Sequence, residues 1–593
     1  MGKGKRAHFD SSRPPVSSAD LLSKVDNYSH DTLYSVLDDA SIEDLLLHEV
    51  AAAPAADPGT PVFNSKGHKT SEKKNVATAA VGKFDDIFAH EKSPSDAHAS
   101  EHLLEETPYG VLMTTYMSYF FLIIFGHIRD FFGMRFRKEE YAHLSTRDGF
   151  AALNSGFDTF YQRRLYRRIR DVFNRPITNV PGRTVTLLER TSDDFNKTFK
   201  LTGNTNEVLN LSSYNYLGFA QAEGPCADEV ETTIRKYGVG ASSSRNEAGT
   251  SDLHIETEAL VARFVGHEAA MLVSMGFATN STTIPALVSK GCLIISDELN
   301  HASLIYGCRI SGAPIKTFKH NDPQDLEKVL RQAIAQGQPR THRPWKKILV
   351  IVEGLYSMEG SICNLPGIVA LKKKYKFYLY VDEAHSIGAL GPNGRGVCDY
   401  FGIDPLDIDI LMGTFTKSFG AAGGYICSSR AIIDIIRLHS FSSVYAESIT
   451  PPILQQIHTS MRIIAGDAHA PEGRRRVAQL ARNARFFSAQ LRKMGFIVYG
   501  DADSPVVPLL LFHPAKIPAF SRAMLERGIA VVVVGYPATP IITSRVRFCL
   551  SAAHTIEDLV YALKMISEVG DEMVLKVSRV NQGQQPHRLL LEE

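Results

Sequence analysis

The sequence predicts an α/β protein whose main domain contains a largely parallel β-sheet with helices on both faces. Between about residues 210 and 568, short runs of Val, Ile and Leu bounded by Gly, Ser and Asp alternate with helix-length segments. Strands buried on both faces have this near-continuous apolar character. The composition agrees, since 44% of the residues are hydrophobic and 22% are charged, as in an average globular protein. These values argue against wholesale disorder and against a multi-spanning membrane protein.

The charge balance argues against a protein that mainly coats nucleic acid. Lys and Arg total 65 and Asp and Glu total 64, which gives a formal net charge of +1. Nucleic-acid binding at that scale needs a large basic excess. The 7 cysteines are scattered without a CxxC pair, which fits a reducing compartment and neither a disulfide framework nor structural zinc. We therefore expect no metal site.

Residues 1–106 are expected to form a largely disordered tail, because Ser, Pro, Asp, Lys and Ala dominate them. The tail carries no recognisable signal peptide. Residues 107–128 then contain no Asp, Glu, Lys or Arg over 22 positions. A helix of this length spans roughly 30 Å, the thickness of a bilayer's hydrocarbon core. We expect a membrane-associated helix there, with a buried or interfacial helix as the alternative.

Residues 129–209 are expected to form a basic juxtamembrane and N-terminal segment. Arg129, Arg135 and Arg137 follow the apolar run at once, and five further arginines lie within 163–170. This asymmetry is typical of the cytoplasmic side of a membrane that carries anionic lipid. A solvated helix face is the alternative for the arginines alone. We expect one anchor, with everything downstream in the cytosol.

Six runs are expected to be strands of a large domain over 210–455. They are 269–273, 293–296, 348–352, 378–381, 408–412 and 424–427. A further strand-like run at 529–534 suggests a smaller C-terminal α+β domain over 456–570, which a polar tail at 571–593 would follow.

Polar residues follow several of these runs, at the sheet edge where open parallel sheets bind ligands. In chain order they are Gly276 and Phe277, Ser357, Asp382 and His385, and Thr414 and Lys417. Each motif alone is weak. The DEAH run at 382–385 also occurs in helicases, but no GxxxxGK[ST] loop precedes it.

Together these groups meet the requirements of pyridoxal 5′-phosphate (PLP). A lysine flanked by small residues can bond to an aldehyde, and a neighbouring acid can keep a pyridine nitrogen protonated. Open amides at a helix N-terminus can hold a phosphate.

At these motifs the chain resembles the α-oxoamine synthases, the PLP-dependent acyl-CoA condensing enzymes of fold type I, and most closely the catalytic subunits of eukaryotic serine palmitoyltransferases. The resemblance spans about 105–570. It is carried by NLSSYNYLGFAQ at 210–221, SDELNHAS at 296–303, RPWKKILV at 343–350, DEAHSIGALGPNGRGV at 382–397, GTFTKSFGAAGGY at 413–425 and YPATPIITSRVRFCLSAAHT at 536–555. It implies an aspartate-aminotransferase-like fold and an acyltransferase that condenses L-serine with palmitoyl-CoA. The products would be 3-ketodihydrosphinganine, CoA and CO₂, in the first step of sphingolipid biosynthesis.

The resemblance also implies roles for the residues that hold the cofactor. Lys417 would bond to the cofactor and later act as the base at the Cα of the amino acid. Asp382 would pair with the pyridine nitrogen, His385 would reach the phenolic oxygen, and His301 would stack on the ring. The amides of Gly276 and Phe277 would hold the phosphate.

Further candidates lie around this set. Thr414 would add a hydroxyl near the phosphate, and Ser357 is another cofactor candidate. Arg547 would bind the substrate carboxylate, and Tyr214 and Asn215 would lie near the substrate. Arg545, two residues from Arg547, is expected to point to the other side of its strand and to be structural.

The resemblance implies partners as well. A homologous subunit without the lysine would complete a heterodimer, and small membrane subunits would regulate it. We expect an endoplasmic reticulum membrane protein with a cytosolic catalytic domain and no nucleic-acid partner. Two alternatives stay open: another α-oxoamine synthase with a different amino acid or acyl-CoA, and a non-catalytic scaffold subunit, against which the presence of Lys417 argues.

Overall fold

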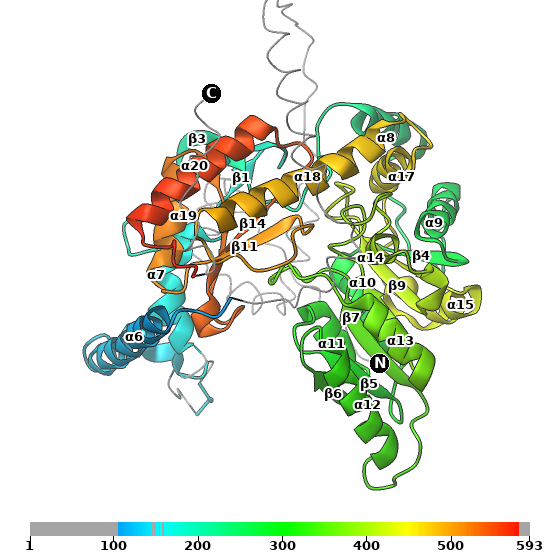
Figure 1. Cartoon of the computed structure of the whole chain (residues 1–593), viewed down its shortest axis with the longest axis horizontal. Coiled ribbons are helices and arrows are strands. Elements are labelled where there is room, and N and C mark those ends of the chain that lie inside the picture. Colours follow the sequence, from blue (N-terminus) through cyan, green and yellow to red (C-terminus); the bar gives the residue numbers. More distant parts are fainter. Residues whose placement is uncertain (1–104, 145, 147–148, 153, 157–158, 580–593) are drawn as a thin grey trace, which may run out of the picture. The chain divides into compact units, whose positions relative to one another are not determined.

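The computed structural model describes residues 105–144, 146, 149–152, 154–156 and 159–579 (Figure 1). The expected disordered tail at 1–106 lies almost wholly outside the described residues, as does most of the expected polar tail at 571–593.

The main sheet has seven strands in the described part of the chain, in the order β4-β10-β9-β8-β7-β5-β6. Its strands are β4 (Ala269–Val273), β5 (Leu293–Asp297), β6 (Ile315–Phe318), β7 (Ile348–Glu353), β8 (Tyr378–Asp382), β9 (Ile410–Thr414) and β10 (Gly424–Ser428). All neighbouring pairs are parallel except those that β10 forms with β4 and β9. The prediction of a mainly parallel sheet is confirmed.

Helices cover both faces of this sheet, because successive residues of one strand enter two different cores. Ile294 and Ile351 belong to one core, while Ile295 and Val350 belong to the other. The helices of this domain are α8 (Pro225–Tyr237), α9 (Asp252–Val265), α10 (Gly276–Leu287), α11 (Ala302–Ile310), α12 (Pro323–Gln336), α13 (Leu365–Tyr375), α14 (Val397–Phe401), α15 (Arg430–His439), α16 (Phe441–Val444) and α17 (Pro451–Ala465). Side chains of α10, α11 and α15 enter the first core, and those of α9, α12 and α13 enter the second.

The C-terminal part contains an antiparallel sheet in the order β11-β14-β13. Its elements are β11 (Val506–Leu510), β13 (Val532–Val534), β14 (Arg545–Cys549), α18 (Glu472–Lys493), α19 (Lys516–Glu526) and α20 (Ile556–Glu572). A capping box begins α20, in which the side chains of Thr555 and Asp558 each accept a hydrogen bond from the other residue's backbone amide. Leu575 is still buried, so packed structure continues past residue 570.

A further sheet has the order β1-β2-β3-β12, from β1 (Ile177–Thr178), β2 (Thr184–Thr191), β3 (Lys200–Asn210) and β12 (Ile529–Ala530). The single strand expected at 529–534 is therefore two strands. β12 pairs with β3 and β13 pairs with β14, so the chain changes sheet at Val531.

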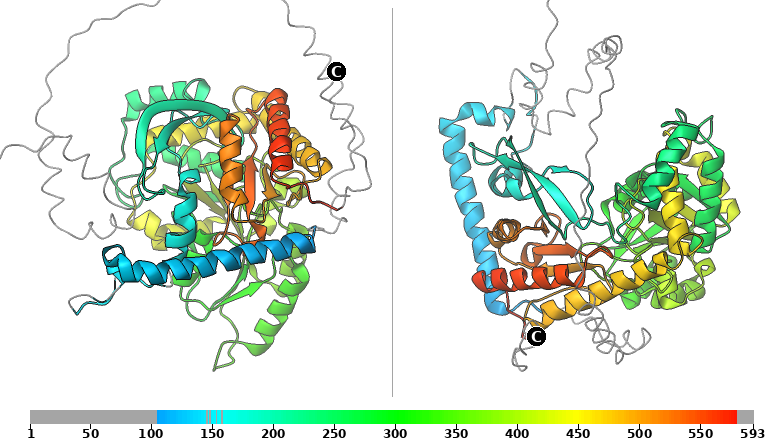
Figure 2. Two further views of the ribbon diagram at one scale, coloured as in Figure 1. Left: turned by 90° about the vertical axis from the view of Figure 1, so that its left-hand side faces the viewer. Right: turned by 90° about the horizontal axis from the view of Figure 1, so that it is seen from above.

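The apolar segment forms α6 (Tyr109–Phe136), a helix of 28 residues that extends beyond the expected 107–128. By length and composition α6 could cross a membrane, which alone is weak support for a span. It lies along the C-terminal part of the protein (Figure 2). Thr114 and Ser118 contact His513 at 3.3 and 3.4 Å, and the ring of His127 stacks on Phe160 at 4.3 Å. Short turns follow, at η1 (Lys138–Leu144), η2 (Gln162–Tyr166), α7 (Arg167–Ile169) and η3 (Arg170–Val172).

Candidate active site

The carboxyl ends of four adjacent strands carry the polar residues of the candidate site. Asp382 ends β8 and is the register partner of Glu353, which ends β7. His301 caps α11, just after β5, and Lys417 lies three residues after the end of β9. The parallel order of these strands brings to one edge residues that are far apart in the sequence.

Lys417 lies in the loop between β9 and β10, with its Nζ 5.6 Å from the centroid of the Tyr214 ring. Burial lowers the pKa of Lys417 to about 8, although Asp382 and Glu353 partly oppose the shift. Roughly a tenth of such an amine is neutral at pH 7, far more than for an ordinary lysine. This environment makes Lys417 a competent nucleophile and base.

The carboxylate of Asp382 is buried and held in one orientation. Its Oδ2 accepts a hydrogen bond from Asn280 Nδ2 at 2.7 Å, and its Oδ1 accepts one from the Ala384 amide at 2.8 Å. Asn280 also accepts from Tyr380 OH at 2.7 Å and donates to Ser303 Oγ at 2.9 Å. The sequence indicated no role for Asn280, the fifth residue of α10.

His385 is buried beside two tyrosines. Its Nδ1 lies 2.8 Å from Tyr216 OH, and its ring centroid lies 5.0 Å from that of Tyr214. Burial, with the positive charges of Lys417 and Arg547, lowers the pKa of His385 well below its ordinary value. His385 is therefore a neutral imidazole that can exchange a hydrogen bond with an oxygen atom.

His301 presents an exposed imidazole among buried neighbours. Its Nδ1 accepts a hydrogen bond from the Ser303 amide at 3.2 Å, and its own amide donates to Glu353 Oε1. The Phe277 ring, also exposed, lies 6.3 Å from the imidazole. An open aromatic face on a fixed backbone suits stacking against a planar ligand.

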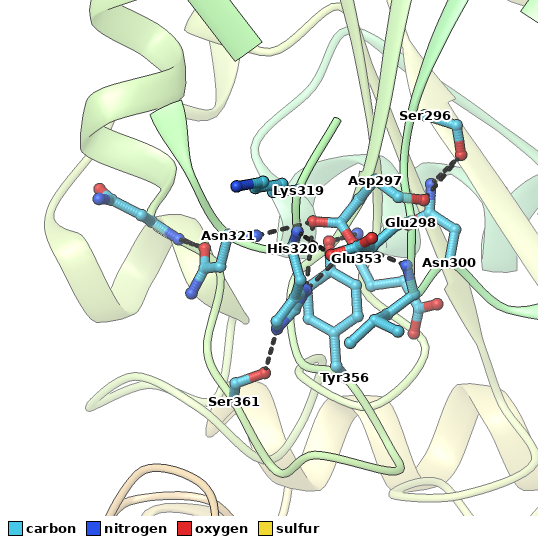
Figure 3. A network of polar contacts seen from close by, with 12 residues as sticks. Ser296, Asp297, Glu298, Asn300, Lys319, His320, Asn321, Glu353, Tyr356 and Ser361 are labelled. Carbon is cyan, nitrogen blue, oxygen red and sulfur yellow. Dashed lines mark hydrogen bonds and ion pairs between the residues drawn. The ribbon is translucent and has the colours of Figure 1, made fainter. Parts of the chain in front are cut away.

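A polar network joins the ends of β5 and β7 to the loop after β6 (Figure 3). Asp297 accepts hydrogen bonds from Leu299 and Asn321 amides at 2.9 and 3.0 Å and contacts His320 Nδ1 at 3.0 Å. Glu353 donates its amide to Tyr356 OH at 3.2 Å. Burial and the Asp382 carboxylate raise the pKa of Glu353 well above its ordinary value.

The first turn of α10 forms an open cradle beside the end of β9. A Cβ on Gly276 would lie 2.8 Å from Thr414 Oγ1, so any other residue here would force Thr414 or the helix to shift. Thr414 Oγ1 donates to the Gly423 carbonyl at 2.9 Å. No side chain caps the start of α10 in the part of the chain that the structure describes. Free amides at a helix N-terminus favour an anion.

Arg547, on β14, connects the C-terminal sheet to the main domain. Its guanidinium carbon lies 4.7 Å from the centroid of the Tyr214 ring, and its Nη1 donates to the Ser357 carbonyl at 3.4 Å. Its Nε is buried and has no hydrogen-bond partner among the described residues. A buried donor without a partner is costly, which fits a site where an anionic substrate completes the bonding.

The expectation that Arg545 points to the other side of the strand from Arg547 is wrong. Residues two apart on a strand share a face, and Arg545 donates to the Met358 carbonyl at 2.7 Å, in the loop that Arg547 also contacts. Arg545 forms an ion pair with Glu359 at 3.4 Å, so its guanidinium is already bonded.

Tyr214 is brought into the site, whereas the side-chain amide of Asn215 bonds to the backbone of its own loop and of Pro181. Burial raises the pKa of Tyr214 to about 12, which keeps its hydroxyl protonated near Lys417 and Arg547. Asn215 Nδ2 donates to the Pro181 carbonyl at 3.2 Å, and its Oδ1 accepts from the Ala220 amide at 3.2 Å. Asn215 thus shapes the loop that presents Tyr214.

The residues fit PLP by the chemistry of their donors. An amine with a lowered pKa, a fixed carboxylate, a neutral histidine and an open helix N-terminus surround one edge of the sheet. In the described residues, no group of three or more His, Cys, Asp or Glu side chains could hold a metal ion.

Comparisons with known proteins agree with this reading. A model of the aminotransferase class I and II family matches residues 206–566. The chain is 56% identical to serine palmitoyltransferase 2 of Schizosaccharomyces pombe over 474 residues, which cover 80% of the chain and 79% of the relative. It is 50% identical to serine palmitoyltransferase 3 of Homo sapiens over 536 residues, or 89% of the chain and 97% of the relative.

Solved structures give the same result. The serine palmitoyltransferase of Sphingomonas wittichii matches with a TM-score of 0.58 and 32% identity, over 63% of this chain and 89% of that one. A high-resolution structure of SPT with PLP matches with a TM-score of 0.61 and 30% identity, over 71% of this chain and 98% of that one.

Proposed function

The chain belongs to the serine palmitoyltransferases, within the class I and II aminotransferase family, and from this premise we propose that it condenses L-serine with palmitoyl-CoA. The reaction depends on PLP and yields 3-ketodihydrosphinganine, CoA and CO₂, as the first step of sphingolipid biosynthesis. The observation that carries the proposal is Lys417, a lysine with a pKa of about 8 at the edge of the sheet where Asp382 and His301 lie. A non-catalytic scaffold would have no need of this amine.

The bound cofactor supplies an aldehyde for covalent attachment and a cationic ring that withdraws electrons from the substrate Cα. Lys417 would bond to that aldehyde and, once its amine is free again, remove the proton from the Cα of serine. The lowered pKa supports both roles, because each needs the neutral amine.

Asp382 would hold the proton on the pyridine nitrogen. Its hydrogen bonds from Asn280 and the Ala384 amide leave its carboxylate little freedom to turn away. His385, anchored by Tyr216, would bond to the phenolic oxygen, and His301 would cover one face of the ring.

Gly276, Phe277 and Thr414 would hold the phosphate at the start of α10, where helix amides are free. Arg547 would bind the carboxylate of serine, and its unpartnered Nε supports this role. Ser357 would be a further cofactor contact, and its carbonyl accepts a hydrogen bond from Arg547. Tyr214 would fill the space between Lys417 and Arg547 and limit the access of water.

The direct test is product identification by mass spectrometry, from L-serine with a mixture of acyl-CoAs and with the homologous subunit coexpressed. The wild type and a control, Lys328→Ala on the exposed side of α12, should both make the C18 keto base, whereas Lys417→Ala should make none. Failure of the wild type to make the C18 keto base, or product formation by Lys417→Ala, would overturn the proposal.

The partner in this account is a homologous subunit that lacks the lysine. Small membrane subunits would bind the same assembly and regulate it. Purification of the full chain from membranes in mild detergent should recover both kinds of partner, and recovery of a catalytically complete homodimer would contradict the heterodimer.

For localisation, the proposal is that α6 lies in the surface of the endoplasmic reticulum membrane, with the catalytic domain in the cytosol. The face of α6 formed by Thr115, Tyr119, Gly126 and Asp130 is buried against the protein, while its other sides expose many aromatic and aliphatic residues. A helix packed on its own domain along this length cannot also be surrounded by lipid, which supports an interfacial position.

Substitutions on the exposed face of α6 test its interfacial position better than deletion of the helix would, because they leave the face that packs on the protein intact. Phe120→Ser, Phe121→Ser and Phe125→Ser together should release the full chain from membranes and leave PLP binding unchanged. Continued membrane association of this variant in the absence of partner subunits would count against the proposal.

A further inference from the structure

A basic cavity of about 570 Å³ lies at the C-terminal end of α6, between this helix and the segment that contains η2 and α7. Figure 2 shows this end of α6, from which the chain turns back toward the body of the protein. Among the described residues that line the cavity, seven of thirteen are Lys or Arg and none is Asp or Glu.

Asp130 neutralises part of this positive charge from behind the cavity wall. Asp130, buried on α6, pairs with Arg163 at 3.0 Å and with Arg164. These pairs fix two guanidinium groups in place. Arg129, Arg168 and Lys197 line the cavity with exposed side chains. Guanidinium groups gathered in this way favour phosphate, which they can bind through two parallel hydrogen bonds.

The surroundings of the cavity are apolar and face outward. Phe132 and Phe136 line its wall, and their side chains are 54% and 78% exposed. Phe131, 68% exposed, continues this surface along α6. Phosphate-binding cations next to exposed aromatic rings match the boundary of a bilayer, where headgroups meet acyl chains.

We propose that this cavity binds the headgroup phosphate of an anionic phospholipid, and thereby fixes the depth and orientation of α6 on the membrane; the proposal rests on the interfacial position of α6 given above. The cytoplasmic leaflet carries anionic lipids that attract clustered Lys and Arg. Charge complementarity and continuity with the exposed face of α6 select a membrane lipid as the occupant. A soluble phosphate compound would gain nothing from the aromatic rim.

The test is flotation of the full-length holoprotein with vesicles of phosphatidylcholine alone or with one fifth phosphatidylserine. The cavity variant combines Arg129→Gln, Arg168→Gln and Lys197→Gln. The control variant combines Arg135→Gln, Lys138→Gln and Lys200→Gln, which are exposed cations of the same region that do not line the cavity. PLP absorbance shows that each variant is folded.

The wild type and the control variant should prefer phosphatidylserine vesicles. The cavity variant should lose that preference by on the order of a hundredfold, because its three cations would contact the lipid phosphate directly, whereas those of the control would face the membrane through screening solvent. Equal losses in the two variants would mean diffuse charge attraction and would overturn the site. A raised KM for palmitoyl-CoA in the cavity variant, with vesicle preference retained, would assign the cavity to CoA phosphates and overturn it too. Absence of binding to either kind of vesicle would refute the position of α6 itself, leaving the proposed reaction untouched.

Discussion

Replacement of Asn280 by alanine is expected to disturb both the fold and the cofactor site, because it removes three buried hydrogen bonds. The amide of Asn280 donates to Asp382 Oδ2 at 2.7 Å and to Ser303 Oγ at 2.9 Å, and its oxygen accepts from Tyr380 OH at 2.7 Å. Loss of a bond to a carboxylate costs about 1.5–3 kcal/mol, and the buried Tyr380 hydroxyl left without its acceptor costs about 1–3 kcal/mol. The free energy of unfolding should therefore fall by roughly 2.5–6 kcal/mol.

Urea denaturation followed by circular dichroism measures this loss for Asn280→Ala, Tyr380→Phe and the double variant. Since Tyr380→Phe removes the stranded hydroxyl, the double variant should recover about 1–3 kcal/mol relative to Asn280→Ala. PLP affinity, from absorbance titration, should fall in both variants that lack Asn280, because the Asp382 carboxylate is no longer held. A stability loss under about 1 kcal/mol, or PLP affinity equal to that of the wild type, would show that Asn280 does not hold the Asp382 carboxylate.

Three further predictions concern single residues of the site. The rate at which PLP reacts with the cofactor-free chain should increase as pH rises to about 8, the lowered pKa of Lys417, and then level off, because only the neutral amine reacts. Stopped-flow absorbance measures this rate. A rate that keeps increasing toward about pH 10, as for an ordinary lysine, would contradict the prediction. Gly276→Val should weaken PLP binding in equilibrium dialysis, because a Cβ would lie 2.8 Å from Thr414 Oγ1; unchanged affinity would argue against the cradle. Arg547→Lys should raise the KM for L-serine roughly tenfold, about 1.4 kcal/mol, with cofactor content unchanged; loss of cofactor instead would remove Arg547 from the substrate site.

The main sheet could be predicted because its strands are apolar and buried on both faces. The run at 269–273 matches β4, and the ends expected for β7 and β8 differ by one residue from those observed. The edge strand β6 was missed because only Phe318 is buried in it. β3 was missed because most of its residues are exposed, so neither strand has an apolar run.

The candidate site could be predicted where residues directly follow strands. Asp382 is the last residue of β8 and Lys417 lies three residues after β9, and the motif around each is specific. Asn280 could not be predicted, because its partner Asp382 lies 102 residues away in the sequence. The error at Arg545 has another cause, since the two-residue repeat of a strand places it on the same face as Arg547.

The central claim is that Lys417 is the amine to which the cofactor bonds. Reduction of the holoprotein with borohydride, digestion and mass spectrometry would locate the pyridoxyl group on a single peptide. We expect the label on Lys417 and none on Lys417→Ala. A label on another lysine while Lys417 stays unmodified, or undiminished labelling of Lys417→Ala, would place the cofactor bond elsewhere.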